Sequence, residues 1–355
     1  MAGEARRDDA RLWPVGMVLL LPLIGLALLI ARPELDLHLE HHPSHFWIVL
    51  IAAAVNVVLA YVTNVAAGRY RDARLALISL AFLASAGFLG LHALATPAVL
   101  LPTANIGFTI ATPVGLIIAS VFAAASATPL AGPRAMDVLR ARPVLLYGLI
   151  GFMVLWAVGS IAQLPPLDGP TPAREGAGVL DILSIVAVGL YAFASFQLIR
   201  QYGYRGGTLL LAMAAALVLL AEALIAMVVS RNWQFSWWEW HLLLLAAFAI
   251  IALAARNEYQ RLGSLTGAFG GLYLEATLAR VERWYASSVA AVAAAESSGG
   301  STDLVLAELR REGATEEELA LLAQTAREVG RLDATFRPYL PSVVSERIRR
   351  PRHPC

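Results

Sequence analysis

Residues Leu209–Val229 read LLLAMAAALVLLAEALIAMVV, and this stretch decides the fold. Glu222 is its one charged residue. At 1.5 Å per residue, a helix of this length covers about 30 Å, which is the thickness of the hydrocarbon core of a bilayer. The apolar run 208–230 therefore predicts a transmembrane helix.

The rest of the chain repeats this pattern. Of its 355 residues, 58% are hydrophobic and 15% are charged, which is too apolar for a soluble globular chain. The first run is too long for a signal peptide, and no clear cleavage site follows it. We predict an all-α polytopic membrane helical bundle of about eight spans. The other seven runs are 13–31, 47–67, 75–95, 106–126, 144–163, 179–199 and 239–254.

Arginine placement predicts the orientation, because cytoplasmic loops are enriched in basic residues. All 27 basic residues are arginines. Thirteen arginines lie in the segments of one side, against three (Arg32, Arg174 and Arg231) on the other. We therefore expect an inner-membrane protein of a bacterium, with both termini cytoplasmic. The net charge of +1 predicts no nucleic-acid partner.

The predicted organisation has four parts: a cytoplasmic N-terminus 1–12, a transmembrane domain 13–255, a cytoplasmic helix 256–296 and a helical linker 297–355. In 272–296, apolar residues recur every three to four positions. Thr315 and Glu318 form a capping box that opens another helix, and Pro338 ends it. These helices are expected to be connectors without a large core of their own.

Four of the seven histidines crowd into Asp36–Trp47, DLHLEHHPSHFW. They are His38, His41, His42 and His45, whose spacing would place all four on one face of an unbroken helix. Pro43 is unfavourable inside a helix but suits a first turn. We therefore expect the second span to begin there, with His42 near its cap and His45 one turn inside.

Two hypotheses account for this cluster. Imidazole nitrogen suits zinc, copper, iron or nickel, so the four histidines are a candidate metal site, with Asp36, Glu40 or Glu239 completing or orienting it. Alternatively, they form a polar loop at the membrane surface or sense pH. Both hypotheses place the cluster on the extracytoplasmic face.

His92, His241 and Glu222 form a second candidate site, for haem or another ligand. An ionisable side chain within a span is costly unless it faces the protein interior. The predicted topology puts His92 at the outer end of the third span and His241 at the outer start of the eighth, on the same side as the histidine cluster. These residues either bind a cofactor or pair with one another as structural contacts.

The segment WQFSWWEW, 233–240, places four tryptophans at the outer boundary. An interfacial aromatic belt is the simpler interpretation, and a lid over an apolar ligand is the alternative. No phosphate-binding loop, nucleophile elbow, HExxH or GxGxxG is present in the sequence, so it carries no hydrolase, NTPase or nucleotide-cofactor signature.

The run RLDATFRPYLPSVVSERIRR, Arg331–Arg350, resembles the segment that precedes the catalytic domain of bacterial class III adenylate/guanylate cyclases. The matching motif residues are Phe336, Arg337, Tyr339, Leu340 and Pro341. The segments EHHPSHFW and WWEWH also resemble the multi-span N-terminal region of actinobacterial cyclases. The resemblance implies a sensory input module that dimerises through its C-terminal helices.

The resemblance carries over no catalytic residue, because the chain ends at RRPRHPC, where the cyclase catalytic domain would begin. We therefore expect an input module that is catalytically incomplete as given. The alternative is a membrane haem or metal protein for electron transfer or metal handling. A small-solute transporter is disfavoured, because no internal repeat is found and the charged residues cluster at one face.

Overall fold

In a computed structural model of the chain, every described element is a helix, as predicted. The structure describes residues 2–94, 96–97, 99, 102–130, 133–175, 178–205, 207–270, 285–286, 288–292, 294–295, 302–311 and 316–336. It divides into two compact units, Met1–Tyr273 and Leu274–Cys355. Within the described part of the first unit, seven helices are long and apolar enough to cross a membrane. The chain is a multi-pass membrane protein.

Eight helices correspond to the eight apolar runs. They are α1 (Ala2–Ala31), α2 (His42–Tyr70), α3 (Ala73–Ala93), α5 (Ala111–Ala127), α6 (Pro133–Ile161), α7 (Val179–Arg205), α8 (Thr208–Val229) and α9 (Phe235–Leu262). The run 106–126 differs from the prediction, because it is divided into α4 (Ile106–Thr109) and α5. At 17 residues, α5 is shorter than the other spans.

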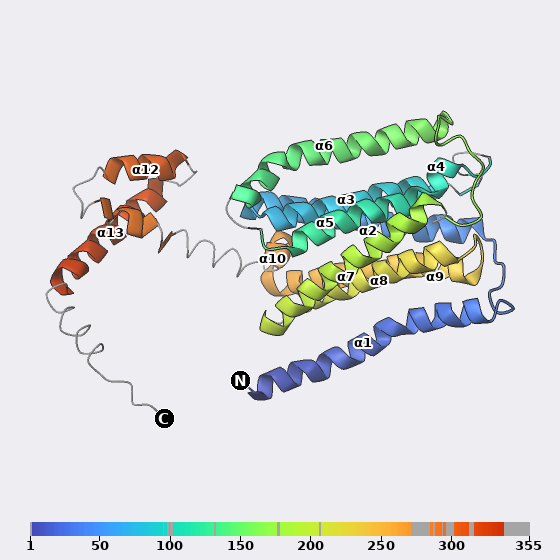
Figure 1. Cartoon of the computed structure of the whole chain (residues 1–355), viewed down its shortest axis with the longest axis horizontal. Helices are drawn as coiled ribbons and strands as arrows, with labels where there is room; N and C mark the ends of the chain where they lie inside the picture. The colour runs from blue at the N-terminus through green and yellow to red at the C-terminus, as the bar shows by residue number, and fades with distance from the viewer. Residues whose placement is uncertain are drawn as a thin grey trace, which may run out of the picture. The chain divides into compact units, whose positions relative to one another are not determined.

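The six helices α2, α3, α5, α7, α8 and α9 form the core of the first unit, each packed against the next, with α9 returning to α2. Of these eight helices, two lie outside the ring: α6 against α3, and α1 against α8 and α9 (Figure 1). The short helix α10 (Leu265–Gly270) packs against α9 and α2. The apolar sequence of α8 explains its central place, because a helix that is apolar all round is expected to be buried. In its membrane span, 83% of the residues are buried, against 6% for α1.

Small residues allow the helices to pack closely. A side chain at Gly115 of α5 would meet Phe88 of α3 and would lie 3.1 Å from the carbonyl oxygen of Ala84. Alanines at 76, 84, 216, 223, 226 and 247 are fully buried at the contacts between helices. Close approach through small residues is the usual way that membrane helices gain packing energy.

The N-terminus of α9 is held by residues of the loop between α1 and α2, 200 positions earlier in the sequence. Asp36 accepts hydrogen bonds from the backbone N–H and the hydroxyl of Ser236, both at 2.8 Å. The carbonyl oxygen of Leu37 accepts from the amide of Phe235 at 3.1 Å. These bonds satisfy free amides of the first turn, and they place the start of α9 beside the start of α2.

In the second unit, α12 (Thr302–Arg311) and α13 (Glu316–Phe336) pack against helical residues of 285–295. Leu309, Leu319 and Leu322 are buried with Val289 and Val292. The described residues of this unit are helical and their core is small, and the role of connector stays a prediction. Most of the predicted helix 272–296, the capping residue Thr315 and the motif residues after Phe336 lie outside the described residues.

Candidate metal centre

Three histidines from three helices meet inside the bundle, at the end where α2 and α9 begin and α3 ends. His45 lies in the first turn of α2, His92 in the last turn of α3 and His241 in the second turn of α9. All three side chains are at most 2% exposed. One ring nitrogen of each lies within 4.8 Å of those of the other two. We call these residues the histidine triad.

Backbone carbonyls fix the orientation of two of the rings. His92 Nδ1 lies 3.3 Å from the carbonyl oxygen of Phe108 and 3.2 Å from that of Thr109. His241 Nδ1 lies 2.9 Å from the carbonyl oxygen of Trp237. A carbonyl oxygen only accepts, so in both rings Nδ1 carries the proton and Nε2 presents a lone pair. His241 Nε2 has no hydrogen-bond partner among the described residues.

In the third ring, that of His45, the Nε2 atom faces the Nε2 atom of His92. His45 Nε2 lies 3.2 Å from His92 Nε2, and His45 Nδ1 lies 2.7 Å from the hydroxyl of Thr96. Since His92 Nε2 is an acceptor, His45 bonds to it only with its own proton on Nε2. A metal ion can replace that proton, in which case Nδ1 of His45 carries the hydrogen and donates to Thr96.

The separations suit a first-row transition metal. Zinc at roughly 2.0–2.1 Å from three tetrahedrally placed nitrogens holds them about 3.3 Å apart. The His45–His92 separation of 3.2 Å is close to this value, and a ring nitrogen of His241 lies within 4.8 Å of both. All ligand atoms are imidazole nitrogens, which suit zinc, copper, nickel or iron rather than calcium or magnesium.

A carboxylate lies behind the triad. Glu175, in the loop between α6 and α7, places Oε2 3.7 Å from His92 Nδ1, and its Oε1 accepts from Trp237 Nε1 at 2.8 Å. The side chain is 2% exposed, and burial raises the pKa of the Glu175 carboxyl to about 8. Metal-binding histidines commonly have such a partner on the second nitrogen, which fixes the ring and raises its basicity.

Aromatic rings surround the triad. Trp240 stacks on His241, with ring centroids 3.4 Å apart, and Trp237 lies 5.0 Å from His45. A small cavity of about 50 Å³ opens beside His45 and His92, lined also by Thr96, Glu175 and Asn232. It has room for a water molecule and polar groups to bond it. Aromatic rings thus cover one side of the triad, and Thr96, Glu175 and Asn232 supply polar groups in the cavity on the other side.

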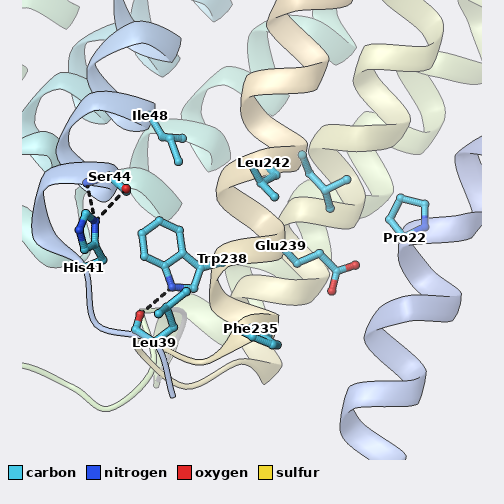
Figure 2. A pocket seen from close by; sticks show the side chains of 10 residues that line it. Pro22, Leu39, His41, Ser44, Ile48, Phe235, Trp238, Glu239 and Leu242 are labelled. Atoms are coloured by element: carbon cyan, nitrogen blue, oxygen red, sulfur yellow. Dashed lines mark hydrogen bonds between the residues drawn. The ribbon is translucent and has the colours of Figure 1, made fainter. Parts of the chain in front are cut away.

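The remaining predicted residues lie elsewhere. His38 and His41 are exposed, and His42 bonds Glu40 at 2.8 Å. His41 caps α2 by accepting from the amide of Ser44 (Figure 2). The four histidines do not share one helix face, because α2 begins at His42, after the N-cap His41, as Pro43 led us to expect. Pro43 lies in its first turn, as expected.

Glu222 does not join His92 and His241. It lies on α8, both of its carboxylate oxygens are buried without a hydrogen-bond partner, and its charge interacts with that of Glu239 on α9. Asp36 caps α9 and Glu40 bonds His42, so the acidic groups expected to complete a site have other roles.

Sequence reasoning missed Glu175 and Thr96. Nothing in the local pattern of PPLDGPTPAREG marks one carboxylate of this loop as buried. The proline at position 113 is a sequence signal that could have predicted a partner of His92. Because proline has no N–H, the carbonyl four residues earlier, that of Thr109, loses its helical donor and is free to accept from His92.

Comparison of the chain with protein-family models, curated proteins and solved structures finds no match.

Proposed function

We propose that the chain is a membrane sensor module in which the histidine triad binds one transition-metal ion. The observation that carries this proposal is the convergence of three buried imidazoles, one ring nitrogen of each lying within 4.8 Å of those of the other two, with two of the rings fixed by backbone carbonyls as lone-pair donors at Nε2. Nε2 of His241 is buried without a hydrogen-bond partner among the described residues, and this costs free energy because the nitrogen has lost its bond to water. A metal ion repays that cost.

The chemistry favours a metal ion over haem. The cavity beside the triad measures about 50 Å³, whereas pockets for organic ligands measure roughly 300–1,000 Å³. Three imidazoles leave one tetrahedral position, and the polar side of the cavity supplies room for a water molecule there. Zinc and copper are the ions that we propose first.

The position of the triad supports a role in sensing. By the arginine distribution, it belongs to the extracytoplasmic side, with both termini in the cytoplasm of a bacterial cell. His241 lies near the start of α9, which continues without a break to Leu262, about 32 Å further along the helix axis. A metal that draws α2, α3 and α9 together therefore displaces a rigid element that reaches the opposite end of the bundle.

The resemblance to the input region of class III cyclases supplies the downstream half of the proposal. In that scheme, α9 passes the displacement to the C-terminal helices, which pair with those of a second chain. Leu304 and Leu321 are exposed apolar residues of α12 and α13, available for such a pairing. Cross-linking of the full chain in membranes through a cysteine in place of Leu321 tests for the homodimer.

The metal half is tested on the purified protein in lipid nanodiscs. Elemental analysis after incubation with Zn²⁺ or Cu²⁺ and desalting should give about one ion per chain. His45→Ala, His92→Ala and His241→Ala should each lose it, whereas the matched control His41→Ala should retain it. Equal metal contents in the wild type and in all three triad variants would refute the site.

The sensing half is tested separately, by amide hydrogen exchange in α12 and α13 with and without the bound ion. Metal should change exchange there in the wild type but not in His92→Ala. Unchanged exchange in a protein that binds one ion leaves a metal-binding protein without the sensory role.

A further inference from the structure

A second site lies between α1 and the bundle. It is a pocket of about 840 Å³, walled by Pro22 of α1, Ile48 of α2, and Leu242 and Leu243 of α9. Figure 2 shows these side chains around the opening, together with Trp238 and Glu239. A volume of this size is typical of sites for organic ligands.

The outer wall of this pocket is loosely held. Only 6% of the residues in the membrane span of α1 are buried, and α1 packs mainly against α8 and α9. A molecule dissolved in the bilayer can therefore enter beside α1 without disturbing the ring of six helices. The walls are mostly aliphatic and aromatic, so they fit an alkyl chain.

The polar groups of the pocket indicate which headgroup a ligand with such an alkyl chain would carry. Trp238 Nε1 donates to the carbonyl oxygen of Leu39 at 2.8 Å, and His41 Nδ1 is bonded to the hydroxyl of Ser44 at 2.8 Å. Glu239 forms no hydrogen bond or ion pair with any residue that the structure describes, and its carboxylate points into the space toward α1 (Figure 2). The pocket thus offers an acceptor and calls for a donor.

Charge selects the kind of donor. Glu239 interacts electrostatically with Asp36 and with Glu222, so acidic side chains gather at this end of the pocket. An ammonium group is attracted there and also finds the face of the Trp238 ring nearby. A phosphate is repelled, which disfavours the headgroup of a phospholipid.

We propose that this pocket binds a membrane-dissolved long-chain primary amine, with its ammonium group on Glu239 and its alkyl chain against Ile48 and Leu242. The site is distinct from the histidine triad and does not depend on metal binding. It gives the module a second input, for an amphipathic cation.

The test is photolabelling of the full chain in phosphatidylcholine nanodiscs. The probes are a long-chain primary amine carrying a diazirine in its alkyl chain and the matched long-chain alcohol with the same diazirine. Labelled residues are located by mass spectrometry, and unlabelled dodecylamine serves as the competitor.

The amine should label residues of α1 and α9 around the pocket saturably, and the alcohol should do so at least about tenfold more weakly, as expected for loss of a charge-assisted hydrogen bond. Glu239→Gln should weaken amine labelling by a similar factor. Leu242→Trp should block it by filling the pocket. Glu258→Gln, at the other end of α9, is the matched control and should leave it unchanged.

Three outcomes would overturn the proposal. They are equal labelling by amine and alcohol, labelling that Glu239→Gln leaves intact, and labelling that phosphatidylethanolamine abolishes at proportions common in bacterial membranes. The last would make the phospholipid headgroup the occupant.

Discussion

The Nδ1 atom of His92 lies 3.2 Å from the carbonyl oxygen of Thr109, an oxygen left without its helical donor by Pro113. A proline in the first turn of α5 thereby orients a histidine on α3. The break between α4 and α5 is therefore part of how the triad is built.

Replacing Pro113 by alanine tests this relationship. The new N–H of residue 113 should bond Thr109, compete with His92 and allow α4 and α5 to join. We expect Zn²⁺ affinity to fall several-fold, because a ligating imidazole loses part of its orienting partner. Isothermal titration measures the affinity. Pro143→Ala, in α6 outside the ring, is the control, and an unchanged affinity in Pro113→Ala would contradict the argument.

Glu175 should act on the metal through His92. Glu175→Gln keeps an acceptor for Trp237 Nε1 but removes a carboxyl that places a negative charge near His92 Nδ1 above about pH 8, so the two proteins are compared at such a pH. Loss of such a partner typically lowers metal affinity 10–100-fold. Competition with a zinc chelator measures the change. Asp168→Asn alters an exposed carboxylate of the same loop and should have no effect, so an equal response in both variants would exclude a specific role for Glu175.

The same residue should give the fold a pH dependence. Burial raises the pKa of Glu175 to about 8 from the 4.5 of an exposed carboxyl. The unfolded chain therefore releases this proton at lower pH than the folded protein, so the contribution of Glu175 to stability is greatest below about pH 4.5. It declines as the pH rises to about 8, where the loss, on the order of a few kcal/mol, is complete.

Thermal unfolding of metal-free protein at several pH values between 5 and 9 checks this sign. The midpoint of the wild type should fall relative to that of Glu175→Gln as the pH rises, because glutamine cannot ionise. A difference between the two midpoints that stays constant over this range would show that the carboxyl is not buried as described.

Packing of α3 on α5 should depend on Gly115. A methyl group at this position meets Phe88 and, at 3.1 Å, the carbonyl oxygen of Ala84, which is backbone and cannot rotate away. Gly115→Ala should destabilise the protein by about 1–3 kcal/mol. Gly189→Ala, on α7 with no atom within 4 Å of the new methyl group, should be neutral or stabilising. Denaturation in mixed micelles compares the two.

Hydropathy alone predicted the spans, because each must be apolar over a length that the bilayer sets. The central place of α8 is a finding of the structure, and it agrees with a sequence that has no polar face. The division of the fourth run was not foreseen, although Pro113 was visible in the sequence. The run is divided because Pro113 lacks the backbone N–H that would bond the carbonyl of Thr109, although its apolar pattern is uninterrupted.

The site could be predicted only in part. His92 and His241 were expected to lie at one end of the bundle, and the structure adds His45 to them. The start of α2 at His42 was expected from Pro43, but which of the four histidines would turn into the bundle could not be read from their spacing. Glu222 was grouped with the histidines by depth in the membrane, whereas which helix face it occupies depends on how the helices pack, and that is not a local property of the sequence.

The bonds from Asp36 and Leu37 to the start of α9 have a consequence for biosynthesis. Residue 36 leaves the ribosome 200 residues before its partner Ser236. The loop after the first span therefore has no partner for these hydrogen bonds until the last span is inserted. Because His241 arrives with that span, the nascent protein cannot complete its triad, and so cannot retain a metal through it, before all of its membrane helices are in place.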